Sequence, residues 1–207
     1  MAATRAYNSE NRLRKQAELR ARIAAAAAAL HARKGALATS YADIAAEAKV
    51  SLPTVYAHFP TMDALLDGCT SHVAGRAPIL PVADIVGAPT LVQAAERLVD
   101  AMEQQHLHFE PWLSWRENRI IPFLADLAGR VRDQRSALIA RVLRQHCGPG
   151  GHRTAVAAWE TALSFDAWHR LARGHRLSRP AVRRATLQCL LATAPPQART
   201  TTSRSKT

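Results

Sequence analysis

The stretch that decides the fold is "SLPTVYAHFP", residues 51–60. Ser51 is a favoured N-cap residue, and Pro53 suits a first helical turn, where a missing N–H costs little. Val55 and Phe59 stand four positions apart, so they share one face of a helix. The stretch therefore predicts a short helix that is anchored to a core by Val55 and Phe59.

Polar side chains crowd the rest of the same short helix, where a core helix would not need them. They are Thr54, Tyr56 and His58. All three can bond phosphate oxygens from an exposed face. The helix N-terminus at Ser51 adds free N–H groups and the positive end of the helix dipole. The stretch therefore predicts a surface that faces a partner outside the protein.

A second short helix is predicted immediately before this one. Thr39 is a suitable N-cap, and the inner face is formed by Tyr41, Ile44, Ala45 and Ala48. Two short helices with a tight link are typical of a helix-turn-helix. In that unit the second helix enters the major groove of DNA and the first lies across the backbone. The hypothesis from these residues is DNA binding; the alternative is a plain helical hairpin in a bundle.

The remaining pattern is helical throughout. We expect a disordered arm at residues 1–10, a helix from Asn11 to Lys34 that Gly35 ends, and a fourth helix capped by Thr61. Residues 76–89 read as a loop or broken helix. A long helix is expected at about 90–109. Pro111 should start another, which Pro122 restarts or kinks, and a further helix should run to about 146. The last two are expected at 153–173 and 179–193.

The predicted fold class is therefore all-α, with about nine helices. The expected division is a helix-turn-helix domain at 1–60, an effector-binding and dimerisation domain at 61–194, and a disordered tail at 195–207.

Composition narrows the class of partner. The formal net charge of +12 favours a polyanion, although genome bias toward arginine and alanine explains such a charge equally well. Three separated cysteines and the absence of a signal-peptide core predict idle thiols in a cytoplasmic protein. The alanine-rich run at 23–30 is too short and too weakly apolar to span a bilayer.

Residues 23–66 resemble the DNA-binding domain of the TetR family of transcriptional regulators. The matching pieces are Lys34-Gly35, Thr39-Ser40, Asp43-Ile44-Ala45, Val50-Ser51, Thr54-Val55-Tyr56, His58-Phe59 and Asp63-Ala64-Leu65-Leu66. The resemblance implies an all-helical homodimer. It also implies N-terminal helices that bind an operator, and a C-terminal pocket whose small-molecule ligand releases the DNA.

The resemblance also implies roles for individual residues. Thr39 would bond a phosphate from the start of the first short helix, and the second would hold the backbone through Thr54, Tyr56 and His58. Leu52 and Pro53 fall at the base-reading positions, where they offer apolar contact alone.

Three positions depart from the family pattern. Lys49 stands where a turn glycine is usual; a positive φ would strain it by about 1 kcal/mol, although its charge could reach a phosphate. Ala42 and Met62 replace frequent phosphate-binding residues. The basic stretch at 12–22 is the candidate to compensate, and its alternative is a solvated helix face.

The C-terminal two-thirds are less specific. The last two helices resemble the dimer-forming pair of the TetR family, and the predicted interface residues are Trp159, Phe165, Trp168, Leu187 and Leu190. An aromatic cluster with polar neighbours predicts a small-molecule site; it consists of Phe109, Trp112, Trp115, Arg116, Arg119 and Phe123. For both sets the alternative is an ordinary core.

Other function classes are weaker. The sequence has no phosphate loop, no H-E-x-x-H and no nucleophile elbow, so we do not expect an enzyme. His106 and His108 diverge on a helix, and no metal or cofactor is expected. The prediction is a repressor released from a near-palindromic operator by a small molecule. A DNA-binding regulator without such an effector, or an activator, remains an alternative.

Overall fold

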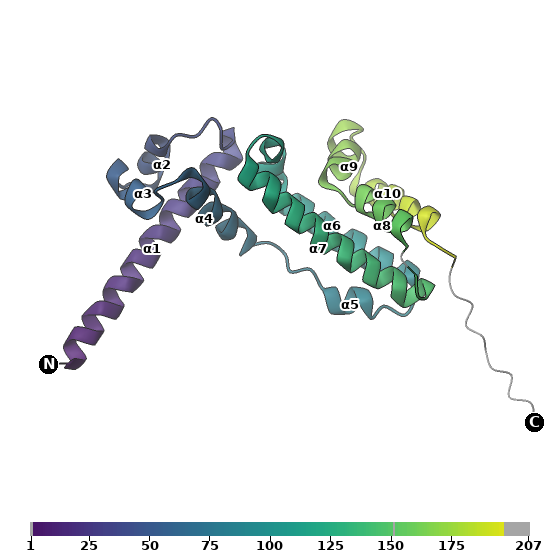
Figure 1. The fold of residues 1–207 in the computed structure, drawn as a ribbon. Helices are drawn as coiled ribbons and strands as arrows, with labels where there is room; N and C mark the ends of the chain where they lie inside the picture. Colours follow the sequence, from purple (N-terminus) through teal and green to yellow (C-terminus); the bar gives the residue numbers. More distant parts are fainter. Residues whose placement is uncertain (1, 151, 197–207) are drawn as a thin grey trace, which may run out of the picture. The chain divides into compact units, whose positions relative to one another are not determined.

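The computed structural model describes residues 2–150 and 152–196, with the backbone alone for residues 2–10. Over this part of the chain it contains ten α-helices and no β-strand (Figure 1). They are α1 (Ala2–Lys34), α2 (Tyr41–Ala48), α3 (Leu52–His58), α4 (Met62–Ala74), α5 (Val82–Val86), α6 (Leu91–Leu113), α7 (Pro122–Cys147), α8 (Arg153–Ala162), α9 (Phe165–His169) and α10 (Arg179–Thr193). A 3-10 turn, η1 (Glu117–Arg119), and a π-helical turn, η2 (Arg170–Gly174), complete them. The all-α prediction is confirmed.

Most predicted helix ends are where the local chemistry placed them. Ser51 and Thr61 cap α3 and α4 by accepting the amides of Thr54 and Ala64. Gly35 ends α1 with a positive φ of 80°, which favours glycine. A capping side chain binds the amide three residues further on, and this spacing can be recognised in the sequence. The predicted and observed helix starts agree for this reason.

Three predicted boundaries were wrong. α1 begins at Ala2 rather than Asn11, because no glycine or proline interrupts the chain before Gly35. Pro111 lies inside α6 instead of starting a new helix, where its missing N–H leaves the Leu107 carbonyl without the usual intrahelical bond. The predicted helix 153–173 is broken at Ser164, whose side chain caps α9. Of the predicted tail, residues 197–207 lie outside the described residues.

The chain forms two compact units. Unit 1 comprises Met1–Ala77 and His108–Leu127, and unit 2 comprises Pro78–Leu107 and Ala128–Thr207. Unit 1 thus contains α4 and the turn between α6 and α7, beyond the boundary at residue 60 that the sequence suggested. Its core is formed by α1 to α4.

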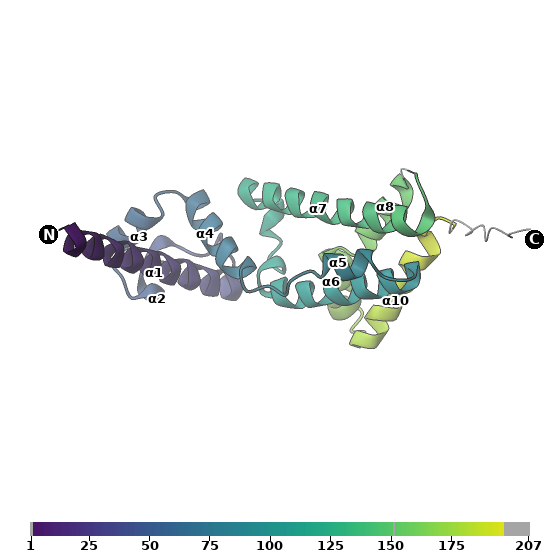
Figure 2. The same ribbon diagram turned by 90° about the horizontal axis from the view of Figure 1, so that it is seen from below.

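Figure 2 shows the helices α6, α7, α8 and α10 of unit 2. Their buried residues share one hydrophobic core. Trp159 and Leu190 are central to it: both are fully buried, and the indole N–H of Trp159 donates to the Leu190 carbonyl at 2.9 Å. Among the described helices, none is long and apolar enough to cross a bilayer.

Candidate nucleic-acid interface

The helix α3 has one buried and one exposed face. Val55 and Phe59 are fully buried, as their spacing predicts, whereas 49% of Tyr56 and 39% of Leu52 are exposed. Ser51 and Pro53 are exposed as well, and Thr54 and His58 are partly buried. A seven-residue helix therefore presents its first turn and Tyr56 to the outside while two side chains fix it to the core.

The first turn of α3 is organised by a pair of hydroxyls. The Ser51 oxygen accepts the Thr54 amide at 3.3 Å, and the Ser51 and Thr54 hydroxyl oxygens are 2.7 Å apart. This pairing orients Thr54 and leaves each hydroxyl capacity for a further hydrogen bond.

The ring of Tyr56 is supported from α2. It stacks on Tyr41 with ring centroids 4.6 Å apart and planes 13° from parallel. Burial and the neighbouring Tyr56 raise the pKa of Tyr41, and its buried hydroxyl has no hydrogen-bond partner among the described residues. The stack restricts the Tyr56 ring, so less rotamer entropy is lost when its hydroxyl meets a ligand. Sequence reasoning placed Tyr41 on the inner face of its helix and missed this contact.

The turn between α2 and α3 has a left-handed backbone at Lys49, a conformation that favours glycine. Lys49 is left-handed, with φ 54° and ψ 50°. Its amide donates to Ala46 and the next amide, of Val50, donates to Ala45, which is the Schellman pattern of a helix C-terminus. The lysine therefore carries the strain of about 1 kcal/mol that glycine would avoid, and its side chain is exposed beside α3.

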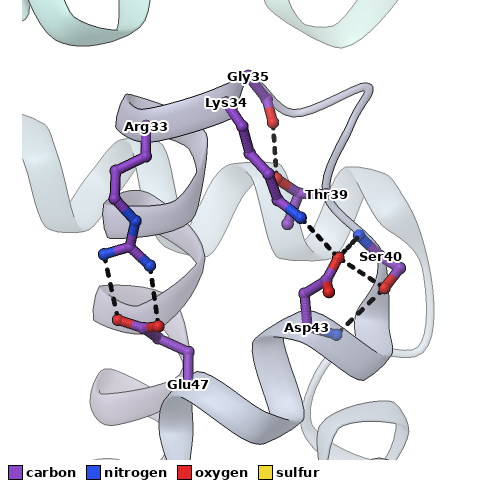
Figure 3. Close-up of polar contacts among 7 residues, drawn as sticks. All are labelled: Arg33, Lys34, Gly35, Thr39, Ser40, Asp43 and Glu47. Carbon is purple, nitrogen blue, oxygen red and sulfur yellow. Dashed lines mark hydrogen bonds and ion pairs between the residues drawn. The ribbon is translucent and has the colours of Figure 1, made fainter.

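The start of α2 differs from the prediction. Ser40, not Thr39, is the N-cap: its oxygen accepts the Asp43 amide, and the Asp43 carboxylate accepts the Ser40 amide (Figure 3). Thr39 is 5% exposed and donates its hydroxyl to the Gly35 carbonyl at 2.6 Å. The exposed hydroxyl at this helix start therefore belongs to Ser40.

Two ion pairs join the end of α1 to α2 (Figure 3). Arg33 donates to both oxygens of Glu47, at 3.3 and 2.8 Å, and Lys34 lies 2.9 Å from the Asp43 carboxylate. Lys34, followed by Ser40, holds the pKa of Asp43 well below its usual range. These cations orient α2 within the unit and are not free to meet a phosphate.

Part of the basic stretch at 12–22 is also used internally. The Arg20 guanidinium donates to the His58 carbonyl at the end of α3 and lies 4.1 Å from the centroid of the Phe59 ring. Arg20 thus satisfies an open carbonyl of α3 and packs on its anchor. The other arginines of the stretch, Arg12, Arg14 and Arg22, are exposed.

The aromatic cluster predicted as a ligand site lies in unit 1, where it packs on α1 to α4. Phe109, Trp112 and Phe123 are packed against the core of α1 to α4. The indole N–H of Trp112 donates to the Ala28 carbonyl at 2.8 Å, and that of Trp115 to Ala32 at 3.3 Å. Arg116 has a positive φ of 58° before η1, and Arg119 ends that turn.

Glu117 makes the contact that sequence reasoning did not find. Its carboxylate accepts the backbone amides of Ala36 and Leu37, at 2.7 and 2.8 Å, in the loop between α1 and α2. Gly35 is required beside it, because a Cβ there would lie 2.6 Å from the carboxylate. A residue of the turn between α6 and α7 therefore binds the loop that leads into the helix-turn-helix.

The predicted dimer residues divide into two groups. Trp159, Trp168 and Leu190 are buried within the protomer, whereas Phe165 and Leu187 are half-buried. Only residues of the second group keep surface for a second copy. Among the described residues, no group of three or more side chains could hold a metal ion.

The geometry of unit 1 is that of a helix-turn-helix with an exposed, capped second helix, and it defines a DNA-binding protein. Residues 23–69 match the model of the family described as bacterial regulatory proteins, tetR family. Residues 23–69 therefore form a DNA-binding domain of the TetR type.

The fold as a whole also has a counterpart among solved structures. The chain is similar to the solved structure of the multidrug binding protein EbrR complexed with imidazole, with a TM-score of 0.60 and 22% identity over 87% of this chain and 92% of that one. No curated protein sequence matches the chain significantly.

Proposed function

We propose that the protein is a transcriptional repressor that binds a near-palindromic operator as a homodimer and is released by a small molecule. Each protomer inserts α3 into one major groove, and the two copies are about one DNA turn apart. The observation that supports this most directly is the exposure pattern of α3. Tyr56 faces outward on a helix whose opposite side is anchored by the fully buried Val55 and Phe59.

The contacts in this proposal follow from chemistry and position. Leu52 and Pro53 meet base edges by apolar contact. The phosphates are held by Ser51, Thr54, Tyr56, His58 and Lys49, together with the free amides of the first turn of α3. Ser40 supplies the hydroxyl at the start of α2, and Thr39 acts indirectly by fixing the loop before it.

The dimer is proposed to form through α8, α9 and α10. Phe165 and Leu187 keep partly exposed apolar surface there, while Trp159 and Leu190 support them from the core. A two-fold contact uses the same patch on both copies, which matches the symmetry of a palindromic site. Truncation before Thr154 should give monomers in light scattering; a stable dimer would move the interface elsewhere.

Release requires that an effector favour a protomer shape that does not fit the operator. A preference of a few kcal/mol is enough to empty the site. The turn between α6 and α7 is the proposed link, because Glu117 binds the loop before α2 and Trp112 binds α1. The alternative is a DNA-binding regulator without a small-molecule effector. In that case no compound would change the affinity for the operator.

The decisive experiment is selection of bound fragments from random DNA with the full-length chain, repeated with candidate effectors. We expect enrichment of a near-palindromic sequence. Tyr56→Phe should then weaken binding to many sequences alike, as the loss of a phosphate contact does. Loss at a single base position would contradict that role, and recovery of random sequence would refute the proposed function. We place this activity in the cytoplasm.

A further inference from the structure

The helix α6 directs one polar side chain into the interior of unit 2. His106 is 5% exposed, and its ring contacts the rings of Trp168 and Phe165, with centroids 5.5 and 5.9 Å away. Its described contacts are with these rings, and neither ring nitrogen hydrogen-bonds a described group.

Burial, with a smaller contribution from Arg135, lowers the pKa of His106 to about 3. At neutral pH the ring is therefore uncharged. A neutral imidazole has one N–H donor and one acceptor nitrogen. Both capacities are open to a small polar guest.

A small cavity adjoins His106. Its volume is about 20 Å³, and it is lined mainly by apolar groups, including Val99, Met102, Leu163 and Trp168. That volume holds about one water molecule. A cavity with mainly apolar walls and a few polar groups, here including His106 and Thr186, has the composition of a small-molecule site.

The charged side chains at the cavity are already paired. Glu103 is bound by Arg179 at 3.1 Å, and Arg183 lies 2.6 Å from Asp100. A charged guest would lack a free counter-ion and would also lose its hydration. The lining therefore favours an uncharged guest.

The wall that carries Trp168 is a short, separately capped element. Phe165 and Trp168 belong to α9, which Ser164 caps, and the π-helical turn η2 continues it. Helix α9 has five residues, and π-helical turns are rare but are frequent at functional sites. A short element of this kind can move without unfolding α8 or α10.

We propose that the effector binds at the His106 cavity beneath α9, and that it is a small uncharged aromatic compound with one hydrogen-bonding group. Its ring stacks on Trp168, its polar group bonds the His106 imidazole, and α9 moves to admit it. This assignment rests on the proposed effector response, and it places the site away from the aromatic cluster at 109–123.

The test uses the full-length chain with phenol as the probe and toluene as its matched analogue without the hydroxyl. We expect saturable chemical-shift changes at the His106 ring and at the amides of α9, together with intermolecular NOEs from phenol to Trp168. His106→Phe should weaken phenol binding about tenfold and leave toluene binding nearly unchanged, because one hydrogen bond is lost. His175→Gln, a change at an exposed histidine of the same unit, should alter neither.

Absence of saturable phenol binding, shifts confined to another region, or equal phenol affinity in the His106 variant would overturn the assignment. If that variant does not fold, the NOEs in the wild-type chain decide. Operator affinity measured on the same samples separates the two claims. DNA binding without a phenol site overturns the cavity assignment alone, whereas phenol binding at His106 by a chain that selects no DNA sequence overturns the regulator function.

Discussion

Removal of the Glu117 carboxylate should loosen the helix-turn-helix by an amount that the structure allows one to work out. The carboxylate accepts two backbone amides, but they differ in access to water. Ala36 is 5% exposed, so its amide would be left without a partner, whereas Leu37 is 62% exposed and water can replace the lost bond. The cost of Glu117→Ala is therefore that of about one hydrogen bond to a charged group, about 2 kcal/mol.

This cost should be measurable in two assays. Urea unfolding should show a loss of about 2 kcal/mol. If the loosened loop must be reordered on the operator, fluorescence anisotropy should show binding up to about 30-fold weaker for each domain. The dependence of affinity on salt should stay the same, because Glu117 itself touches no phosphate.

The matched control is Asp126→Ala, which removes an exposed carboxylate from the same unit. It should change neither stability nor operator affinity. Unchanged stability and affinity in Glu117→Ala would refute the reasoning. A changed salt slope would mean that Glu117 acts on the DNA directly.

Four further predictions follow from single side chains. Lys49→Gly should raise the free energy of unfolding by up to about 1 kcal/mol in urea, because glycine accepts the left-handed backbone. If Lys49 also meets a phosphate, the slope of log affinity against log salt should fall by about 0.9. Leu52→Gln should change the base preference in selected fragments, and an unchanged preference would mean that DNA shape dominates. Asp43→Asn should destabilise the chain at neutral pH, and its difference from wild type should shrink below about pH 4 in urea melts, because the native carboxyl has a lowered pKa. In the wild type, the free energy of unfolding should fall as the pH drops from 6.5 to about 3, because the imidazole of His106 is protonated in the unfolded chain but not in the folded one. His106→Phe should make this fall smaller.

The parts of the DNA-binding unit that could be predicted from the sequence are those set by local spacing. Ser51 and Thr61 bind amides three residues on, and Val55 and Phe59 share a face because they are four residues apart. The error at Thr39 was avoidable: Ser40 stands three residues before Asp43, which is a capping-box spacing. Thr39 and Ser40 are both possible N-cap residues, but only Ser40 has an acidic residue, Asp43, three positions later.

The aromatic residues at 109–123 show why other assignments could not be made from sequence. Trp112 and Trp115 have the composition of a ligand site, yet they donate to α1 carbonyls more than 80 positions away in the chain. Glu117 meets its amides across a similar separation. Periodicity identifies which face of a helix is apolar, but it carries no information about which distant element covers that face.

The charge of the chain proves a poor guide to its proposed DNA contacts. Lys49, between the two short helices, is exposed, but Arg20, Arg33 and Lys34 are each paired with groups of the protein. They stabilise the arrangement of α1, α2 and α3 in place of neutralising phosphates. The exposed groups that remain on α3 and at the start of α2 are largely hydroxyls and helix amides. Such donors fix the register of the protein on a duplex, but because they are uncharged their binding displaces few counter-ions from the DNA. Affinity for an operator should therefore depend on how rigidly these donors are held, and that rigidity comes from the internal cations and from Glu117.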